Sequence, residues 1–368
     1  MKFPFCCSKC FSSPSDAAAA VVDESTHANP GEQTPQSFPV FSYRELRSVT
    51  HGFQNKIGEG GFGSVYKGRL QDGTVVAVKV LSVDIESMRG EREFISEIAA
   101  LSAIKHENLV SLRGCCVHGA ERFLVYDYME NNSLARTLLG REQNRIKFGW
   151  ELRWAISLGV ARGLAYLHEE VAPHIAHRDI KASNILLDQN FTPKVSDFGL
   201  SRLFTDNASH ISTRVAGTLG YVAPEYAQSG HLTRKSDVYG FGVLLLEIIS
   251  GRSVVVFDME HGEHHLVEKA WEMHMANELL QLVDPTLKDF PQEEAVRFLK
   301  VGLLCVQEAA GRRPQMSAAI KMLTNEIDID DAHISKPGVV ANLRDVKVGH
   351  IHSSQSIISK ATSSTNFF

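Results

Sequence analysis

The stretch HRDIKASN at residues 177–184 decides the fold of this chain, together with the triplet DFG at residues 197–199. A lone HRD triplet is a weak signal. An Asp with Lys two positions later, Asn five positions later and DFG downstream is a highly specific combination. Asn184 and Asp197 carry the hard oxygen atoms that Mg²⁺ prefers as ligands. Asp, Lys and Asn also favour turns, so a charged loop without chemistry is the alternative interpretation.

This combination resembles the catalytic core of protein kinases. The resemblance implies that Asp179 orients an acceptor hydroxyl and accepts its proton, and that Lys181 lies against the γ-phosphate of ATP. It also implies that Asn184 and Asp197 bind Mg²⁺, with Mn²⁺ as the alternative metal. His177 is then expected to form hydrogen bonds in the core rather than to act as an acid or base.

Residues 57–65 contain a glycine-rich pattern of the form GxGxxGxV, which begins at Gly58 and lies between two runs of β-forming residues. The glycines alone would also fit a dinucleotide-binding turn, but that turn leads into a helix. Here the turn Asp72-Gly73 separates two predicted strands. A glycine-rich hairpin brings backbone close to phosphates because glycine has no Cβ. The candidate ATP-binding residues in this hairpin are Ile57, Gly58, Glu59, Gly60, Gly61, Phe62, Gly63, Ser64 and Val65.

Lys79 interrupts an apolar strand. It is either an edge residue whose ammonium group extends to solvent or a cation held in a fixed position for function. The second interpretation is favoured by a helix predicted around residues 91–104, in which Phe94, Ile98 and Leu101 form an apolar stripe. Glu97 lies on that stripe, and an inward-facing carboxylate needs a partner. In protein kinases the matching Lys and Glu form an ion pair that orients the α- and β-phosphates, so the resemblance implies that Lys79 pairs with Glu97.

Residues 123–130 form a predicted buried strand that runs into a polar connector, and residues 127–130 are the predicted hinge between two lobes. By resemblance, Tyr126 is the gatekeeper behind the adenine, and Asp127 and Met129 supply backbone hydrogen bonds. A tyrosine at this position resembles the plant receptor-like and animal interleukin-receptor-associated kinases. The remaining candidate ATP-binding residues are Ala77, which would face the adenine with Val65, and Leu186.

Residues 209–218, which precede the triplet APE, match the activation segment of kinases. Arg178 can pair with a phosphate placed in this segment and order it through charge-assisted hydrogen bonds. We therefore expect regulation by phosphorylation at Ser212 or Thr213, with Ser209 as a weaker candidate.

Thr218 also lies in this segment and is counted among the candidate phosphosites. Its position before Leu219-Gly220-Tyr221 favours a different role, namely contact with Asp179 and Lys181 in the acceptor site. A lysine at position 181, where tyrosine kinases carry arginine-containing loops, favours a Ser or Thr hydroxyl as the acceptor. A Tyr acceptor remains open.

Beyond the hinge, the spacing of apolar residues predicts mainly helices. Residues 237–249 are apolar nearly all round and are followed by Gly251, which predicts a buried helix with a glycine C-cap. Asp237, at its start, is expected to brace the backbone of the HRD triplet. Arg313 is a candidate partner for Glu225.

Six cysteines are split between the N-terminus and the body of the chain. The cluster Cys6, Cys7 and Cys10 is a candidate for palmitoylation, which would give peripheral contact with a membrane. An unmodified tip and a zinc site that lacks its fourth ligand are the alternatives. Lys2 excludes N-myristoylation. The three cysteines in the body of the chain are expected to pack as small hydrophobic residues. They are Cys115, Cys116 and Cys305.

The composition excludes several classes of protein. The chain has 38 Lys and Arg residues against 43 Asp and Glu residues, which gives a net charge of −5. It therefore lacks the excess positive charge that is typical of nucleic-acid-binding proteins. No apolar run approaches the ~20 residues that span a bilayer. Residues 1–11 lack the apolar core of a secretory signal. We expect a location in the cytosol or at the cytoplasmic side of the plasma membrane.

The predicted fold is α+β, a two-lobed protein kinase fold with a β-rich N-terminal lobe that holds one key helix and a mainly helical C-terminal lobe. Ser42 and Glu45 match a capping box at the start of a helix that leads into the domain. The expected boundaries are 1–40 for a flexible tail, 41–52 for the leading helix, 53–325 for the kinase domain (lobes at 53–126 and 131–325) and 326–368 for a disordered tail.

Within the kinases, the chain is similar to plant receptor-like cytoplasmic serine/threonine kinases of the receptor-like kinase/Pelle group. The resemblance rests on the stretches FSY (41–43), NNSL (131–134), GLAYLH (163–168) and GTLGY (217–221). It implies protein substrates with Ser or Thr acceptors and an upstream receptor kinase, in stress, cold or immune signalling beneath membrane receptors. The competing class is a pseudokinase that acts as a binding scaffold. A pseudokinase normally lacks some of the catalytic residues, whereas this chain carries a matching residue at each of those positions. A small-molecule kinase is disfavoured by the activation segment.

Overall fold

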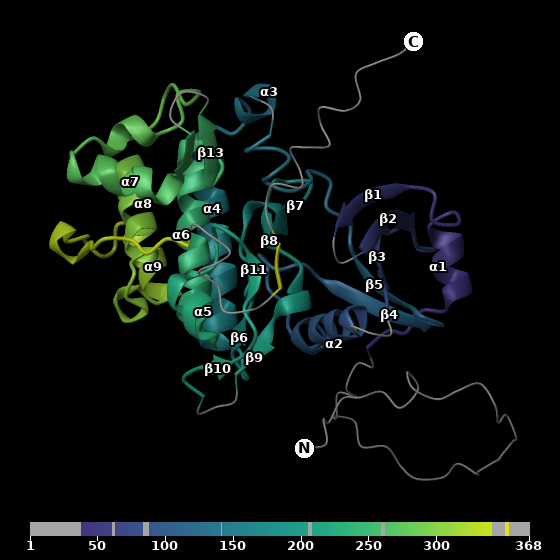
Figure 1. Cartoon of the computed structure of the whole chain (residues 1–368). Coiled ribbons are helices and arrows are strands. Elements are labelled where there is room, and N and C mark those ends of the chain that lie inside the picture. Colours follow the sequence, from purple (N-terminus) through teal and green to yellow (C-terminus); the bar gives the residue numbers. More distant parts are fainter. Residues whose placement is uncertain are drawn as a thin grey trace, which may run out of the picture. The chain divides into compact units, whose positions relative to one another are not determined.

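Two units make up the described part of this computed structural model, which covers residues 38–60, 63–83, 88–140, 142–204, 208–258, 262–340 and 350–352. Unit 1 holds Met1–Phe94 and Leu112–Asp127, and unit 2 holds Ile95–Ser111 and Tyr128–Phe368. The last boundary falls inside the hinge predicted at residues 127–130. Figure 1 shows a β sheet in unit 1 and most of the helices in unit 2, as predicted for the two lobes.

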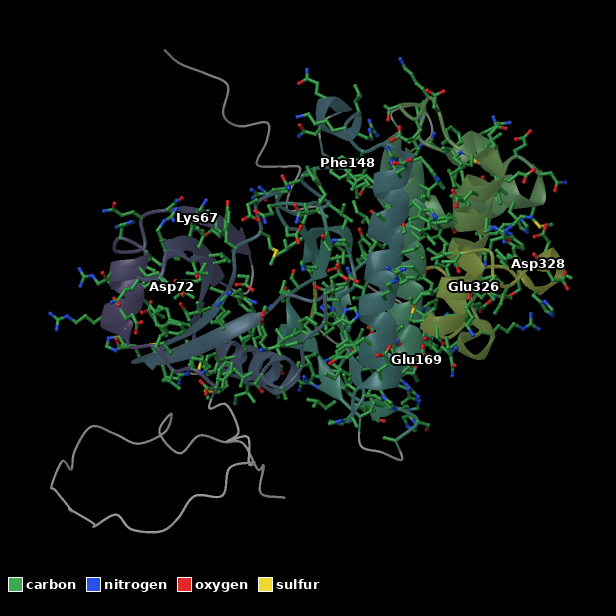
Figure 2. All side chains as sticks on the ribbon, turned by 180° about the vertical axis from the view of Figure 1, so that it is seen from behind. Lys67, Asp72, Phe148, Glu169, Glu326 and Asp328 are labelled. Carbon is green, nitrogen blue, oxygen red and sulfur yellow. The ribbon has the colours of Figure 1, made fainter. Side chains whose placement is uncertain are left out.

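Unit 1 is built on a five-stranded antiparallel sheet with the strand order β1-β2-β3-β5-β4. The turn between β2 and β3 is held by Asp72, whose Oδ1 accepts a hydrogen bond from Thr74 N at 2.9 Å (Figure 2). Gly63 is required at the start of β2, because its φ is +132° and a Cβ there would lie 2.0 Å from Val80 O. The strands are β1 (Lys56–Gly60), β2 (Gly63–Arg69), β3 (Val75–Ser82), β4 (Leu112–His118) and β5 (Glu121–Asp127).

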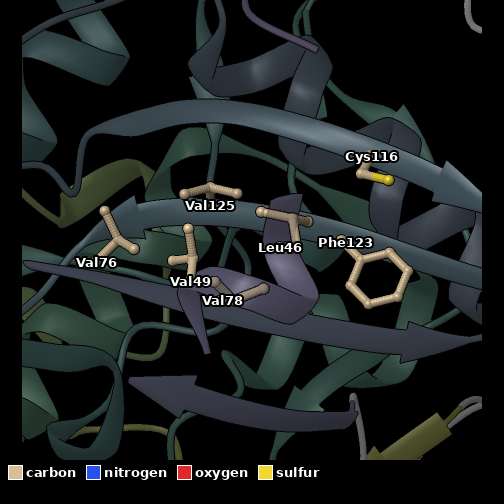
Figure 3. Packing of buried hydrophobic residues seen from close by; sticks show 7 residues of the cluster. All are labelled: Leu46, Val49, Val76, Val78, Cys116, Phe123 and Val125. Carbon is tan, nitrogen blue, oxygen red and sulfur yellow. The ribbon is translucent and has the colours of Figure 1, made fainter. Parts of the chain in front are cut away.

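One face of this sheet packs against helix α1 (Tyr43–Val49), whose N-cap residue Ser42 accepts a hydrogen bond from Glu45 N at 3.1 Å. Burying one large apolar side chain in such a cluster stabilises the fold by roughly 1.5–3 kcal/mol. Because neighbouring residues of a strand point to opposite faces, Ala77 and Lys79 lie on the face away from α1. Figure 3 shows the cluster, formed by Leu46, Val49, Val76, Val78, Cys116, Phe123 and Val125.

Helix α2 (Arg89–Leu101) follows β3 and carries the predicted apolar stripe. Phe94 and Leu101 are 4% and 3% exposed, and Glu97 between them is 1% exposed. The helix is shifted towards the N-terminus relative to the prediction of residues 91–104. Glu97 nevertheless lies on the buried side, as predicted.

Unit 2 is mainly helical. Helix α6 (Arg234–Ser250) is buried along nearly its whole length and ends at Gly251, whose φ is +64° and whose N–H donates to Glu247 O at 2.9 Å. This is the predicted glycine C-cap. The other α-helices described in unit 2 are α3 (Glu142–Arg145), α4 (Trp150–Ala165), α5 (Pro224–Ser229), α7 (Leu266–Met275), α8 (Gln292–Cys305) and α9 (Met316–Leu323). The short strands are β6 (Ile175–Ala176), β7 (Ile185–Leu187), β8 (Pro193–Val195), β9 (Arg202–Leu203), β10 (Ile211–Ser212), β11 (Ala216–Thr218), β12 (His231–Leu232), β13 (Val255–Asp258), β14 (Gly262–His265) and β15 (His350–His352).

Polar contacts tie the helices of unit 2 together. The side chains of Arg153 and Asp284 are both 0% exposed, and Arg153 Nη2 lies 2.6 Å from Asp284 Oδ2. Arg153 also donates to Ile248 O at 2.8 Å, so its buried charge is both paired and hydrogen-bonded, as such a charge must be. Glu169, labelled in Figure 2, accepts a hydrogen bond from Ser317 N at 3.0 Å near the start of α9.

The segment after α9 differs from the prediction that residues 326–368 are disordered. Ile334 and Val340 are only 7% and 4% exposed, and the Tyr239 hydroxyl donates to Gly338 O at 2.7 Å. Residues 334–340 therefore pack on the rest of unit 2, whereas most of residues 326–333 are exposed. The packed segment is held by isolated buried residues and backbone acceptors, which leave no periodic signal in the sequence. Residues 350–352 form β15, which pairs with β11.

No helix in the described ranges is long and apolar enough to cross a bilayer. The cysteines of the body are buried, as predicted, and burial raises the pKa of Cys305 to about 12, so its thiol is unreactive. The cluster Cys6, Cys7 and Cys10 lies outside the described residues.

Candidate active site

The HRD triplet is held in place by Asp237 in the first turn of α6. Asp237 Oδ2 accepts a hydrogen bond from His177 N and Oδ1 accepts one from Arg178 N, both at 2.7 Å, which confirms the predicted brace. Arg178 needs this support because its φ is +74°, a costly conformation for a residue other than glycine. Burial alone would raise the pKa of Asp237, but its hydrogen bonds to His168 and His177 hold that pKa below its usual value.

His177 forms hydrogen bonds in the core, as predicted. Its Nε2 lies 3.0 Å from Ser196 O, and its ring contacts Phe198 edge-on with 4.7 Å between the centroids. Burial lowers the pKa of His177, so the ring stays neutral at pH 7. The residue therefore positions the DFG segment beside the catalytic loop.

Asp179 lies at the centre of a hydrogen-bonded group and is 2% exposed. Thr218 Oγ1 donates to Asp179 Oδ1 at 2.7 Å. Lys181 Nζ lies 2.7 Å from Asp179 Oδ2 and 2.7 Å from Thr218 Oγ1. This is the predicted contact of Thr218 with both residues. The carboxylate thus already accepts a hydrogen bond from an aliphatic hydroxyl, next to a fixed positive charge.

The two candidate metal ligands lie on neighbouring segments of unit 2. Asn184 Nδ2 donates to Asp179 O at 2.9 Å and to Asp179 Oδ2 at 3.1 Å, so the amide oxygen of Asn184 remains as its acceptor atom. Ser196 N donates to Asn184 O at 2.9 Å, which brings the residue before Asp197 next to Asn184. An amide oxygen and a carboxylate on adjacent segments fit Mg²⁺, which takes oxygen ligands.

Four candidate ATP-binding residues of unit 1 share the sheet face opposite α1, namely Val65, Ala77, Lys79 and Tyr126. The strand register places Val65 opposite Lys79 and Ala77 opposite Tyr126, and directly opposed residues of an antiparallel pair share a face. Within the glycine-rich hairpin, Ile57, Gly58, Glu59 and Gly60 lie in β1, Gly63 and Ser64 lie in β2, and Gly61 and Phe62 fall outside the described residues.

The remaining candidates are divided between the units. Asp127 ends β5 in unit 1, whereas Met129 and Leu186 belong to unit 2, where Leu186 lies in β7. Lys79 lies in unit 1 and Glu97 in unit 2. Their pairing stays a prediction.

Arg178 contacts the activation segment directly. Its Nη1 donates to Leu200 O at 3.0 Å, its Nη2 donates to Arg214 O at 2.8 Å, and its Nε donates to the Tyr226 hydroxyl at 3.2 Å. The Tyr226 hydroxyl in turn donates to Arg214 O at 3.0 Å. Sequence reasoning missed Tyr226, because a single tyrosine after the APE triplet carries no spacing signal.

The predicted phosphosites Ser212 and Thr213 directly precede Arg214 in the activation segment. Ser212 is exposed in β10, which pairs with β12, and Thr213 N donates to Gly230 O at 2.9 Å. Ser209 is also exposed. The structure therefore leaves Ser212 accessible to a modifying enzyme, while Arg178 uses backbone carbonyls and Tyr226 as its described acceptors.

The predicted pair of Glu225 and Arg313 anchors the APE triplet. Arg313 donates from Nη1 to Glu225 Oε1 at 2.8 Å and from Nη2 to Glu225 Oε2 at 2.7 Å, a bidentate arrangement. Arg313 also donates to Lys235 O at 3.0 Å. The pair is confirmed, and it joins α5 to the first turn of α6.

A buried carboxyl group in α6, Glu247, anchors the segment that follows Thr218. Its Oε2 accepts a hydrogen bond from the Tyr221 hydroxyl at 2.7 Å, and its Oε1 accepts one from Val254 N at 2.8 Å. Burial raises the pKa of Glu247 to about 8 and that of Tyr221 well above its usual value. Sequence reasoning missed this pair, although a lone acidic residue in an apolar run signals a buried partner.

Comparison with known proteins agrees with this geometry. The family described as "Protein tyrosine and serine/threonine kinase" matches residues 52–323. Cold-responsive protein kinase 1 of Arabidopsis thaliana is 56% identical over 314 residues, which cover 84% of this chain and 80% of the relative. A probable LRR receptor-like serine/threonine-protein kinase of the same plant is 51% identical over 307 residues, which cover 83% of this chain and 29% of the relative. The chain therefore belongs to the protein tyrosine and serine/threonine kinase family, and it is a serine/threonine protein kinase.

Proposed function

We propose that this kinase transfers the γ-phosphoryl group of ATP to Ser and Thr hydroxyls of proteins, with Asp179 as the base. The hydrogen bond from the Thr218 hydroxyl to Asp179 supports this most, because the carboxylate already accepts a hydroxyl of the right type. In the reaction, the acceptor hydroxyl gives its proton to Asp179 and its oxygen bonds to the γ-phosphorus. The bond from that phosphorus to the β–γ bridging oxygen breaks, and ADP leaves.

Positive charge and oxygen ligands surround the proposed base. Lys181 Nζ lies 2.7 Å from Asp179 Oδ2, where its charge can stabilise the transferring group. Asn184 and Asp197 would hold Mg²⁺, or Mn²⁺ as the alternative. When bound, the ion would neutralise charge on the phosphate oxygens. Because Asn184 also donates to Asp179, one side chain would link the metal site to the base.

The sheet face of unit 1 supplies the proposed ATP-binding surface. Lys79, oriented by Glu97, would bind the α- and β-phosphates under the glycine-rich hairpin. Val65 and Ala77 would contact the adenine. Tyr126, Asp127, Met129 and Leu186 would complete that site.

We place the enzyme in plant signalling, downstream of a receptor kinase at the plasma membrane. The receptor-like relative supports this class of partner. Palmitoyl groups on Cys6, Cys7 and Cys10 would hold the chain on the cytoplasmic surface. Phosphorylation of Ser212 or Thr213 would regulate it, which fits the exposure of Ser212.

The test is phosphoryl transfer from radiolabelled ATP to the chain itself and to myelin basic protein, followed by identification of the labelled amino acids. We expect label on Ser and Thr that requires Mg²⁺ and is lost in Asp197→Asn. Asp289→Asn, which changes an exposed acidic residue, is the matched control and should keep full activity. A folded, phosphorylated wild-type chain that binds ATP without transferring phosphate would instead support the scaffold class.

A further inference from the structure

A strand from the C-terminal region lies beside the activation segment. β15 pairs in parallel with β11, so that Ala216 lies opposite His350, Gly217 opposite Ile351 and Thr218 opposite His352. Figure 1 shows this short yellow strand next to β11. Residues far apart in the sequence thus share one small sheet.

β11 is fixed on the catalytic loop. Thr218, its last residue, donates to Asp179 at 2.7 Å, and Ala216 N donates to the Tyr226 hydroxyl at 3.1 Å. Gly217 has a φ of +136°, and a Cβ there would lie 2.9 Å from the carbonyl oxygen of Arg178. An extended segment that pairs with β11 therefore runs beside the residue that is bonded to the proposed base.

We propose that β11 is a strand-addition site for protein substrates and that residues 350–352 of this chain occupy it in cis as a competing segment. The proposal rests on the function proposed above. In strand addition, main-chain hydrogen bonds give the affinity and leave side chains to provide specificity. None of the residues His350, Ile351 and His352 carries a hydroxyl group. The paired segment can therefore block the site without being an acceptor itself.

The length of the connection favours binding in cis. Nine residues, 341–349, join the packed segment that ends at Val340 to β15. A connection of this length spans at most about 30 Å, and a short tether gives an effective concentration in the millimolar range. Three paired residues make few hydrogen bonds, so a substrate with additional side-chain contacts can displace them. The expected consequence is a raised KM for protein acceptors.

The kinetic test uses the full chain with Ile351→Pro and His352→Pro combined. Only alternate N–H groups of a strand face its neighbour, so two consecutive prolines remove at least one donor to β11, whether it comes from Ile351 or from His352. We expect the peptide KM to fall about 3- to 10-fold, as loss of a tethered competitor predicts, with kcat and the KM for ATP unchanged. The matched control combines Ser363→Pro and Ser364→Pro, outside β15, and should leave all three constants at wild-type values. Equal peptide KM values in the three chains would overturn the proposal.

A second test measures the binding of a peptide to β11 without catalysis. A fluorescein-labelled peptide of residues 346–356 is titrated into the full chain that carries the two strand-breaking prolines, and an acceptor peptide is added as competitor. We expect saturable binding that the acceptor peptide reverses, and no binding of the labelled peptide with both prolines. Because no phosphate is transferred, this result separates failure of the tail site from failure of the proposed function. No binding at millimolar peptide would contradict the proposal.

Discussion

Thr218 Oγ1 donates a hydrogen bond to Asp179 Oδ1 at 2.7 Å, and Lys181 Nζ contacts both side chains. Thr218 ends β11 in the activation segment, whereas Asp179 belongs to the catalytic loop braced by α6. The bond therefore couples the position of the activation segment to the orientation of the proposed base. Any change that moves β11 is expected to move the acceptor site with it.

The first prediction concerns this hydrogen bond. Thr218→Ala removes a bond to a charged group, which is worth roughly 1.5–3 kcal/mol, so kcat/KM for an acceptor peptide should fall about 10- to 100-fold. Thr218→Ser keeps the hydroxyl and should retain most of the wild-type value. Wild-type kcat/KM in the alanine variant would show that the contact has no role in the reaction.

The second prediction concerns regulation. Ser212→Ala combined with Thr213→Ala should lower the activity of the kinase about 10-fold or more, because a phosphate at this place would add one to three charge-assisted hydrogen bonds that order the segment. The comparison is made before and after treatment with a phosphatase. Ser102→Ala, at an exposed serine outside the activation segment, is the control and should respond to phosphatase like the wild type. A double variant as active as the wild type would remove the regulatory role.

The third prediction concerns pH. The pKa of Glu247 is about 8 in the folded chain, against 4.5 for an ordinary Glu, so between these pH values the folded state keeps a proton that the unfolded state has released. The stabilisation is complete below pH 4.5 and is lost as the pH rises through 8. Relative to Glu247→Gln, the free energy of unfolding of the wild type should fall by up to ~1.4 kcal/mol per pH unit.

The measurement for Glu247 is urea unfolding of both chains across pH 5 to 8. Glutamine keeps an oxygen that can accept the hydrogen bond from Val254 N, so the variant isolates the ionisation from the loss of this contact. Two pH profiles that run parallel would mean that Glu247 does not hold its proton in the folded state.

The fourth prediction concerns the N-terminal cysteines. Replacing Cys6, Cys7 and Cys10 with Ser should move the chain from the membrane fraction to the soluble fraction of plant cells, because stable anchoring needs two or more acyl chains. Single replacements should have a smaller effect. An unchanged membrane fraction in the triple variant, or no palmitate on the wild type, would eliminate acylation as the anchor.

The catalytic loop could be predicted well because its motif is local and specific. The contact of Thr218 with Asp179, the brace by Asp237 and the pair of Glu225 with Arg313 join distant segments, and they were expected because these residues stand at motif positions that resemble protein kinases. The strands of unit 1 and the buried helix α6 were predictable for a related reason, since their apolar patterns repeat over many residues.

Long-range contacts made by single residues outside these motifs were not predictable. Tyr226, the acceptor of Arg178, and Tyr221, the partner of Glu247, find their partners only when the chain is folded. The packing of residues 334–340 and the pairing of β15 with β11 also depend on a surface that the rest of unit 2 creates. Such a surface exists only in the folded chain, so no periodic pattern in the sequence predicts it.

The most direct test of the account is the rate of phosphoryl transfer in Asp179→Asn. The amide keeps the shape of the side chain but cannot accept the proton, so kcat should fall by roughly 10²- to 10⁴-fold, while the affinity for ATP and the unfolding temperature stay close to those of the wild type. Asp289→Asn serves again as the exposed control. A kcat in Asp179→Asn equal to that of the wild type would contradict the assignment of Asp179 as the base.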